Sequence, residues 1–88
     1  SRVKDAPLKG KPTLIMSASP GVFGGARAQY HLRQVLVVLD AHVMNVPEVM
    51  VGQVHTKVTD GELTDEGTLS FVGKQLAAFK VFAEKVAP

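Results

Sequence analysis

The chain has 88 residues, of which 45% are hydrophobic and 20% charged, a composition that excludes intrinsic disorder and leaves room for one small core. Ten basic and eight acidic residues, dispersed along the chain, give a net charge of +2, too even a balance for a nucleic-acid-binding surface. There is no cysteine, and the three histidines lack metal-ligand spacing, so we expect neither a disulfide nor a metal site. No signal peptide is visible and no apolar run reaches the roughly 18 residues of a membrane span, which predicts a cytoplasmic protein without membrane contact.

The first predicted element is a strand over residues 13–18, where the run TLIMSA is apolar and uncharged. A continuous hydrophobic run is typical of a parallel strand whose two faces are both covered by helices. The segment SPGVFGG, residues 19–25, follows it and has no helical potential. We therefore expect a buried strand that ends in a glycine-rich loop.

A helix of about four turns is predicted from residue 26 to about residue 40, which contain neither glycine nor proline. Tyr30, Val37 and Val38 lie off its main apolar stripe, so the helix is expected to pack against the sheet on one side and a neighbouring subunit on the other. The predicted stripe consists of Ala28, Leu32, Val35, Leu36 and Leu39.

The second half of the chain predicts another strand and another helix. Residues 41–45 form a short strand, residues 48–51 continue extended after Pro47, and Asp60 and Gly61 form a turn. Thr64 is the predicted N-cap of a helix that runs almost to the C-terminus. Its apolar stripe consists of Leu69, Val72, Leu76, Phe79, Ala83 and Val86.

The order strand, helix, strand, helix predicts an α/β fold with two parallel strands joined by a crossover helix. Because open sheets of this kind generally have about five strands, we expect the chain to be part of a larger sheet. The loop at 19–25 then lies where such sheets bind ligands, outside the carboxyl end of a strand and before a helix N-terminus.

Glycines in this loop suit the close approach of a flat or anionic ligand, because they carry no Cβ. The loop is neither a P-loop nor a GxGxxG fingerprint, so for the loop taken alone an ordinary glycine-rich connection is the preferred interpretation. Arg27, at the start of the following helix, is suited to clamp a ligand phosphate or to pair with a carboxylate such as Glu48. A solvated arginine is the alternative.

Two segments of the chain, KPTLIMSASPGVFGGARAQYHLRQVLVVLDAHVMNVPEVMVG (residues 11–52) and LTDEGTLSFVGKQLAAF (residues 63–79), resemble the C-terminal half of the NADPH-dependent FMN reductase family. These flavodoxin-like proteins include bacterial quinone, chromate and azo-compound reductases. The resemblance implies a flavodoxin-like parallel sheet with helices on both faces. Residues 1–88 would be its C-terminal βαβα portion, and the N-terminal half with the phosphate-binding loop would be absent.

The resemblance also implies the site and its cofactor. The loop residues that match positions against the isoalloxazine ring of FMN are Ser19, Pro20, Gly21, Gly24 and Gly25. Arg27, Tyr30 and Glu48 match positions at or near subunit contacts, which implies a homo-oligomer, a dimer or a tetramer. In such enzymes hydride passes from NADPH or NADH through FMN to a quinone-like or other small acceptor, such as a flavin, an azo compound or chromate. This chemistry needs no dedicated acid or base, so no catalytic side chain is predicted.

Two functions remain open at this stage. In the first, the chain is part of an FMN-dependent reductase and is inactive without its other half. In the second, it lacks flavin and is a non-catalytic interaction or oligomerisation module, or an inactive fragment. The second function would use exposed apolar helix faces and an unpaired strand edge. The presence of flavin and the consumption of NADPH distinguish the two.

Overall fold

The structure is a computed structural model that describes residues 7–86. Its elements alternate between short strands and two helices along the chain. In order they are β1 (Pro12–Thr13), β2 (Met16–Ala18), α1 (Ala26–Val38), β3 (His42–Val43), β4 (Val49–Val51), the short 3₁₀ helix η1 (Val54–Thr56), β5 (Val58–Thr59), β6 (Glu62–Leu63) and α2 (Glu66–Val86).

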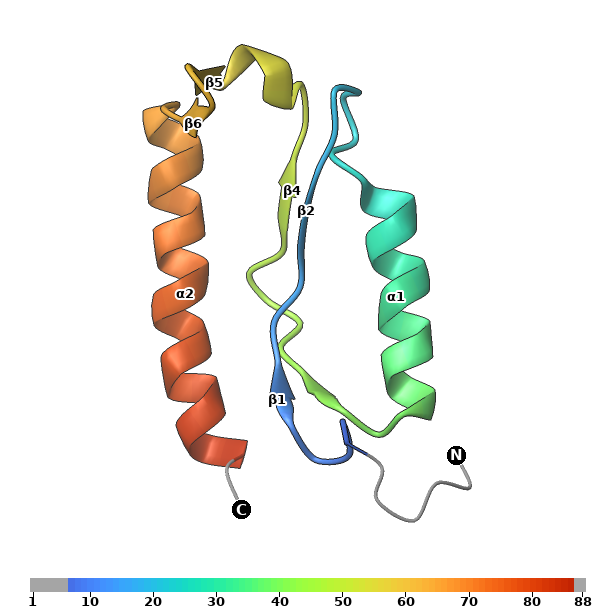
Figure 1. Cartoon of the computed structure of the whole chain (residues 1–88). Helices are drawn as coiled ribbons and strands as arrows, with labels where there is room; N and C mark the ends of the chain where they lie inside the picture. The colour runs from blue at the N-terminus through green and yellow to red at the C-terminus, as the bar shows by residue number, and fades with distance from the viewer. Residues whose placement is uncertain (1–6, 87–88) are drawn as a thin grey trace.

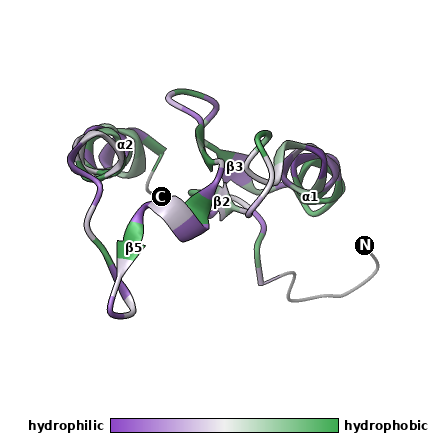
Figure 2. Cartoon of the chain, turned by 90° about the horizontal axis from the view of Figure 1, so that it is seen from above, coloured by the Kyte–Doolittle hydropathy of each residue, from purple (hydrophilic) through white to green (hydrophobic). Residues whose placement is uncertain are grey.

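Parallel strand pairs lie between the two helices, as Figure 1 shows and as the view from above in Figure 2 confirms. β1 pairs with β3 and β2 pairs with β4, both in parallel. α1 contacts β2 and β3, whereas α2 contacts β1 and β4. The predicted α/β architecture, with parallel strands covered by one helix on each side, is confirmed.

The predicted strand at 13–18 is interrupted. Thr13 is paired with Val43, but Met16, three residues on, is paired with Val49, so that residues 14–15 face residues 44–48. Between the two ladders, the segment 44–48 therefore has three more residues than the segment 14–15 that it faces. Backbone carbonyls in this gap lack ladder partners and must be satisfied from elsewhere.

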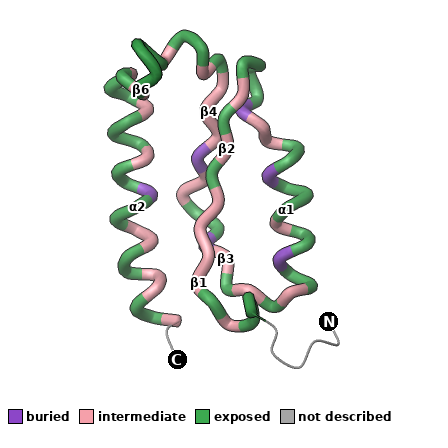
Figure 3. The backbone as a smooth tube through the Cα atoms, viewed as in Figure 1, coloured by how far each residue is buried: buried purple, intermediate pink, exposed green. Residues whose placement is uncertain are grey.

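Two buried glutamines, one from each helix, donate to backbone carbonyls here: Gln75 to two carbonyls inside the gap, and Gln29 to a carbonyl at the start of β4, beside it. Gln75 of α2 is 0% exposed, and its Nε2 donates to Ile15 O at 3.2 Å and to Pro47 O at 3.0 Å. On the other side, Gln29 of α1 donates to Val49 O at 3.0 Å. The buried positions of both helices lie on the sides that face the strands (Figure 3).

The predicted inner face of α1 is wrong, although the helix begins at Ala26 as expected and ends at Val38. Leu36 is buried, but Leu32 and Val35 are exposed, and the inner face carries Gln29 instead. The physical reason is the buried Val49 carbonyl at the start of β4, beside the gap between the ladders, which accepts from Gln29 a hydrogen bond that an apolar stripe cannot provide.

The predicted inner face of α2 is partly right. Val72 and Phe79 are half-buried, as expected, but Leu69 and Leu76 are about half exposed and Gln75 takes the most buried position. Ala83 and Val86 are also half-buried. The inner face of α2 is thus rotated from the predicted stripe toward its glutamine.

Strands β1 and β2 are less covered than the apolar run predicts. Within residues 7–86 each pairs along one edge only, and Met16 is 45% exposed. The buried hydrophobic residues of the described chain are few, namely Leu36, Met44 and Val49. The thin core follows from the open edge, because no further strand or helix covers it within the described residues.

The start of α2 is capped by Asp65 rather than by the predicted Thr64. The Thr68 amide donates to Asp65 Oδ2 at 2.9 Å and the Thr68 hydroxyl at 2.7 Å. Thr64 instead hydrogen-bonds Thr59 across the β5–β6 hairpin, which was not predicted. The turn of that hairpin is the expected one, with Asp60 and Gly61 both at positive φ.

The cap makes the stability of α2 dependent on pH. The Thr68 hydroxyl and amide, together with the Lys57 charge, hold the pKa of Asp65 below its ordinary value of 3.8. A carboxyl with a lowered pKa stabilises the fold above its unfolded pKa, and this contribution is lost as pH falls through the folded pKa.

We therefore expect Asp65→Ala to lower the thermal midpoint by a few degrees at neutral pH, and to flatten the pH dependence of the midpoint below pH 3.8. Asp65→Asn keeps a capping oxygen and should stay near the parent at neutral pH. Circular dichroism melts measure both, with Glu84→Ala on the exposed face of α2 as the control. An Asp65→Ala variant that melts like the control would contradict the cap.

Candidate functional site

The 19–25 loop connects β2 to α1 at the carboxyl end of the β2–β4 pair, the end at the top of Figure 1. It is tied to the last residue of β4 and to the segment after it by three backbone hydrogen bonds. The Ser19 amide donates to Val51 O at 2.9 Å, the Gln53 amide to Gly21 O at 2.8 Å, and the Val54 amide to Ser19 O at 3.0 Å. The loop therefore lies at the predicted end of the strands and has a defined backbone.

Two of the loop glycines are required by contacts within the chain. Gly24 has a φ of +61°, and a Cβ there would lie 2.5 Å from the carbonyl carbon of Met50. Gly25 has a φ of +80°, and its Cβ would lie 3.0 Å from the Cβ of Ser17. These glycines let the loop lie directly on β2 and β4, so their presence does not by itself indicate a ligand.

Gly21 is different. Its φ is not in the left-handed region, and the nearest atom to a Cβ there is Ser19 Oγ at 3.8 Å. The neighbouring Val22 and Phe23 are largely exposed, with Phe23 at 77%. Within residues 7–86, the amides of Gly21, Val22 and Phe23 donate to no other backbone group. The outer part of the loop thus presents open space, apolar surface and consecutive amides.

A polar cluster that the sequence did not reveal lies beneath the loop. Ser17 Oγ donates to Gly24 O at 2.6 Å and accepts from Gln29 Nε2 at 2.9 Å. Arg33 Nη2 donates to Gln29 Oε1 at 2.9 Å. The one available signal was the i, i+4 spacing of Gln29 and Arg33, which places both side chains on one helix face.

Glu48 pairs with Tyr30 and Arg33 rather than with Arg27. The Tyr30 hydroxyl donates to Glu48 Oε1 at 3.0 Å, and Arg33 Nε lies 3.9 Å from Glu48 Oε2. The hydrogen bond to Glu48, partial desolvation and the carboxylate charge raise the pKa of Tyr30, against a smaller opposing effect of Arg33. The expected Arg27–Glu48 pair is not formed, and Arg27 is exposed. Of the three predicted interface residues, the structure brings together Tyr30 and Glu48.

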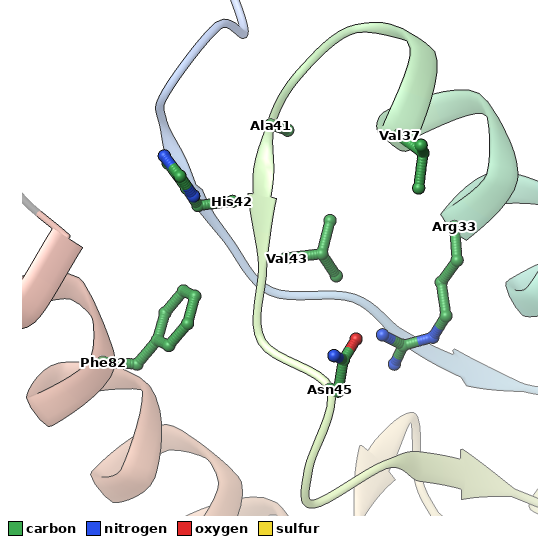
Figure 4. A pocket seen from close by; sticks show the side chains of 7 residues that line it. All are labelled: Arg33, Val37, Ala41, His42, Val43, Asn45 and Phe82. Atoms are coloured by element: carbon green, nitrogen blue, oxygen red, sulfur yellow. The ribbon is translucent and has the colours of Figure 1, made fainter.

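Two cavities lie away from the outer face of the loop. An apolar groove of about 430 Å³ lies between the β2–β4 pair, the hairpin and the first half of α2. A second cavity, of about 330 Å³, lies beside β3; Figure 4 shows the side chains of Arg33 and Asn45 approaching one another on one side of that strand and His42 and Phe82 on the other. Neither is lined by Ser19, Pro20, Gly21, Gly24 or Gly25.

The described part of the chain contains no helix long and apolar enough to cross a membrane. Residues 7–86 also contain no group of three or more histidine, aspartate or glutamate side chains placed to hold a metal ion. The 19–25 loop is therefore the feature that best combines position, exposure and a fixed backbone.

Comparison with known proteins decides the family. The sequence profile of the NADPH-dependent FMN reductase family matches residues 1–56, more than half of the chain. The chain belongs to this family. As an FMN reductase family member it has the flavodoxin-like α/β class expected from the resemblance, represented in part by its parallel strand pairs and two helices.

Individual relatives agree with this assignment. The chain is 56% identical over 88 residues to a protein named quinone reductase from Escherichia coli, an alignment that covers 98% of this chain and 47% of the relative. It is 42% identical over 87 residues to the NAD(P)H-dependent FMN reductase of Pseudomonas aeruginosa, and 40% identical over 74 residues to the NAD(P)H:quinone oxidoreductase of Solanum tuberosum. These two alignments cover 98% and 81% of this chain, and 47% and 38% of the relatives. The family member described here spans about half the length of its bacterial relatives.

The contact of Gly24 with β4 can be tested by substitution. We expect Gly24→Ala to destabilise the fold by at least about 2 kcal/mol, because the added Cβ meets backbone atoms and the φ is positive. Gly21→Ala, which meets only Ser19 Oγ, is the control and should change stability by less than about 0.5 kcal/mol. Denaturant unfolding measures the difference, and equal stabilities of the two variants would contradict the close approach.

Tyr30 offers an optical test of the Tyr30–Glu48 pair, because the chain has one tyrosine and no tryptophan. We expect phenolate absorbance to titrate above the ordinary pKa of 10.0, and Glu48→Gln to bring the pKa back toward that value. Glu84→Gln, on the exposed face of α2, should leave the titration unchanged. If the Glu48→Gln titration coincides with that of the parent, the hydrogen bond is absent in solution.

Proposed function

We propose that this chain is the C-terminal half of an FMN-dependent NAD(P)H oxidoreductase that reduces quinone-like or other small acceptors. The proposal is supported above all by the 56% identity, over 98% of this chain, to a protein named quinone reductase. The position of the 19–25 loop, at the carboxyl end of parallel strands, agrees with it. When bound, FMN supplies the transfer of hydride from NADPH or NADH to the acceptor, for example a quinone, a flavin, an azo compound or chromate.

The outer part of the 19–25 loop fits a flavin ring. Ser19, Pro20 and Gly21 are proposed to lie along the ring, with Gly24 and Gly25 forming the base that holds the loop on the strands. The free amides of Gly21, Val22 and Phe23 are donors suited to the polar edge of the ring. The exposed side chain of Phe23 adds an apolar surface beside them.

The loop provides only part of a flavin site. No residue of this chain is proposed to hold the FMN phosphate, and no side chain is proposed as a catalytic acid or base. The relatives extend over about twice the length of this chain, and that additional length is where the phosphate-binding segment is expected. In this proposal the chain positions one edge of the ring.

Arg27, Tyr30 and Glu48 are proposed to contact a second subunit in a dimer or tetramer. Tyr30 and Glu48 form a pair at the surface of the chain, and exposed apolar side chains, including Val37 and Val38, extend along α1. Apolar surface of this kind on a helix is typical of an interface with another chain.

A non-catalytic association module is the second candidate. The observation that favours it is the thin core: three hydrophobic residues are buried within the described chain, while many large ones are exposed and one strand edge is open. Such a chain gains stability from any partner that covers this surface. This candidate predicts assembly without flavin.

The proposal is tested by replacing the matched segment of the Escherichia coli quinone reductase with the whole of this chain. We expect the chimera to bind FMN and to oxidise NADPH in the presence of benzoquinone, at a rate within about tenfold of the parent reductase. The control is the same reductase with the segment deleted.

The outcomes separate the two candidates. A chimera that is folded by circular dichroism but binds no FMN, or binds FMN without oxidising NADPH, contradicts the reductase function. A chimera that assembles into the parent's oligomer without flavin supports the association module.

A further inference from the structure

A series of hydrogen bonds runs beneath the 19–25 loop, from Arg33 through Gln29 and Ser17 to Gly24, and Arg33 Nε lies 3.9 Å from Glu48, the partner of Tyr30. We propose that Gln29 is a positioning residue that, together with Ser17, sets the shape of the flavin loop, and that Arg33 couples this loop to the surface formed by Tyr30 and Glu48. The inference rests on the proposed function only for the identity of the ligand.

The Gln29 amide has one possible orientation. Its side chain is 3% exposed, and Nε2 donates to both Ser17 Oγ at 2.9 Å and Val49 O at 3.0 Å. Oε1 accepts from Arg33 Nη2 at 2.9 Å. A flipped amide would direct its oxygen at the Val49 carbonyl and its NH₂ group at the guanidinium, so the flip is excluded.

The orientation of the Gln29 amide determines the direction of the Ser17 hydroxyl. Because Ser17 Oγ accepts a hydrogen from Gln29, its own hydrogen is free for Gly24 O, which lies 2.6 Å away. Every bond therefore donates in the same direction, from Arg33 through Gln29 and Ser17 to Gly24. This series of hydrogen bonds fixes the direction of the carbonyl of the Gly24–Gly25 peptide, the last peptide of the loop before α1.

At the other end of this hydrogen-bond series, the Arg33 side chain is incompletely paired. Arg33 Nε is buried and, within residues 7–86, has no hydrogen-bond partner. The nearest carboxylate oxygen, Glu48 Oε2, is 3.9 Å away, too far for a hydrogen bond. Glu48 also accepts from Tyr30, so a neighbouring chain that displaces either side chain changes how Glu48 pairs with Arg33. A contact at this surface is thereby transmitted to the loop.

Gln75 shows that a buried glutamine need not act on the loop. It is as buried as Gln29 and also donates to two backbone carbonyls, Ile15 O and Pro47 O, but it lies on the opposite helix and makes no hydrogen bond to the loop or to Ser17. Gln34, on α1 itself, is exposed. The chain thus contains its own matched controls for a substitution of Gln29.

The test compares Gln29→Leu, Gln75→Leu and Gln34→Leu in the chimera with the Escherichia coli quinone reductase. We expect Gln29→Leu and Gln75→Leu to lower the thermal midpoint to a similar degree, and Gln34→Leu to leave it unchanged. Only Gln29→Leu should raise the Kd for FMN, by about tenfold, and shift the visible absorption of the bound flavin. A Kd that rises equally in Gln29→Leu and Gln75→Leu would mean that Gln29 acts through general stability, and the inference would be wrong.

Ser17→Ala provides a milder variant, should Gln29→Leu fail to fold. It removes the hydrogen bond from the Ser17 hydroxyl to Gly24 O and is expected to raise the Kd for FMN about threefold to tenfold. In the double variant with Gln29→Leu the two effects should not add, because both residues act on Gly24 through the same bonds. An unchanged Kd in Ser17→Ala, or effects that add fully, would overturn the positioning role.

The substitution Glu48→Gln measures the coupling between the 19–25 loop and the surface formed by Tyr30 and Glu48. We expect this variant to change the Kd for FMN severalfold with Gln29 present and by less than about twofold in the Gln29→Leu background. The same change in both backgrounds would show that Glu48 does not act through Arg33 and Gln29.

A flavin-free measurement distinguishes failure of this inference from failure of the proposed function. The amides of Ala26 and Gln53 hydrogen-bond to loop carbonyls, Phe23 O and Gly21 O, so their hydrogen exchange reports the order of the loop. Gln29→Leu should accelerate this exchange about tenfold or more relative to Gln75→Leu. If the unsubstituted chimera binds no FMN, the proposed function is wrong, and the exchange rates alone decide whether Gln29 positions the loop.

Discussion

The middle of this fold is built around a mismatch in length between two neighbouring chain segments. β1 and β2 are separated by two residues and their partners β3 and β4 by five, so the parallel ladder cannot run through the middle of the molecule. The carbonyls left in and next to this gap are taken by two amide side chains, Gln75 from one side and Gln29 from the other. Buried carbonyls without donors are costly, and these two amides accordingly take the most buried position on each helix.

The sequence predicts the order of the main strands and helices, but not which side of each helix faces the strands. Hydropathy correctly places the first helix at Ala26 and the turn at Asp60, since local composition determines both. It assigns Leu32 to the interior and leaves Gln29 out of the buried stripe, because periodicity scores side chains and takes no account of unpaired backbone groups. Only the register between strands far apart in the sequence shows where an amide is needed.

The candidate site was predictable in its position and not in its internal support. The family pattern identifies the loop, yet the reason for Gly24 lies at Met50, a distant residue on the neighbouring strand. Arg27 and Arg33 are both near Tyr30 on α1, and which of them meets Glu48 depends on how β4 is placed against the helix. Features of this kind arise from tertiary packing, which single-sequence patterns do not encode.

The looped-out segment at residues 44–48 has a consequence for how sequences of this kind tolerate changes in length. In a continuous strand, one inserted residue sends every following side chain to the opposite face of the sheet. Here β3 and β4 are held by separate ladders, so the alternation of one does not determine that of the other. An insertion between them therefore does not by itself reverse the side of the sheet on which Val49 is buried. What limits the length of this segment is instead its own contacts, the buried Met44 side chain and the Pro47 carbonyl that accepts from Gln75.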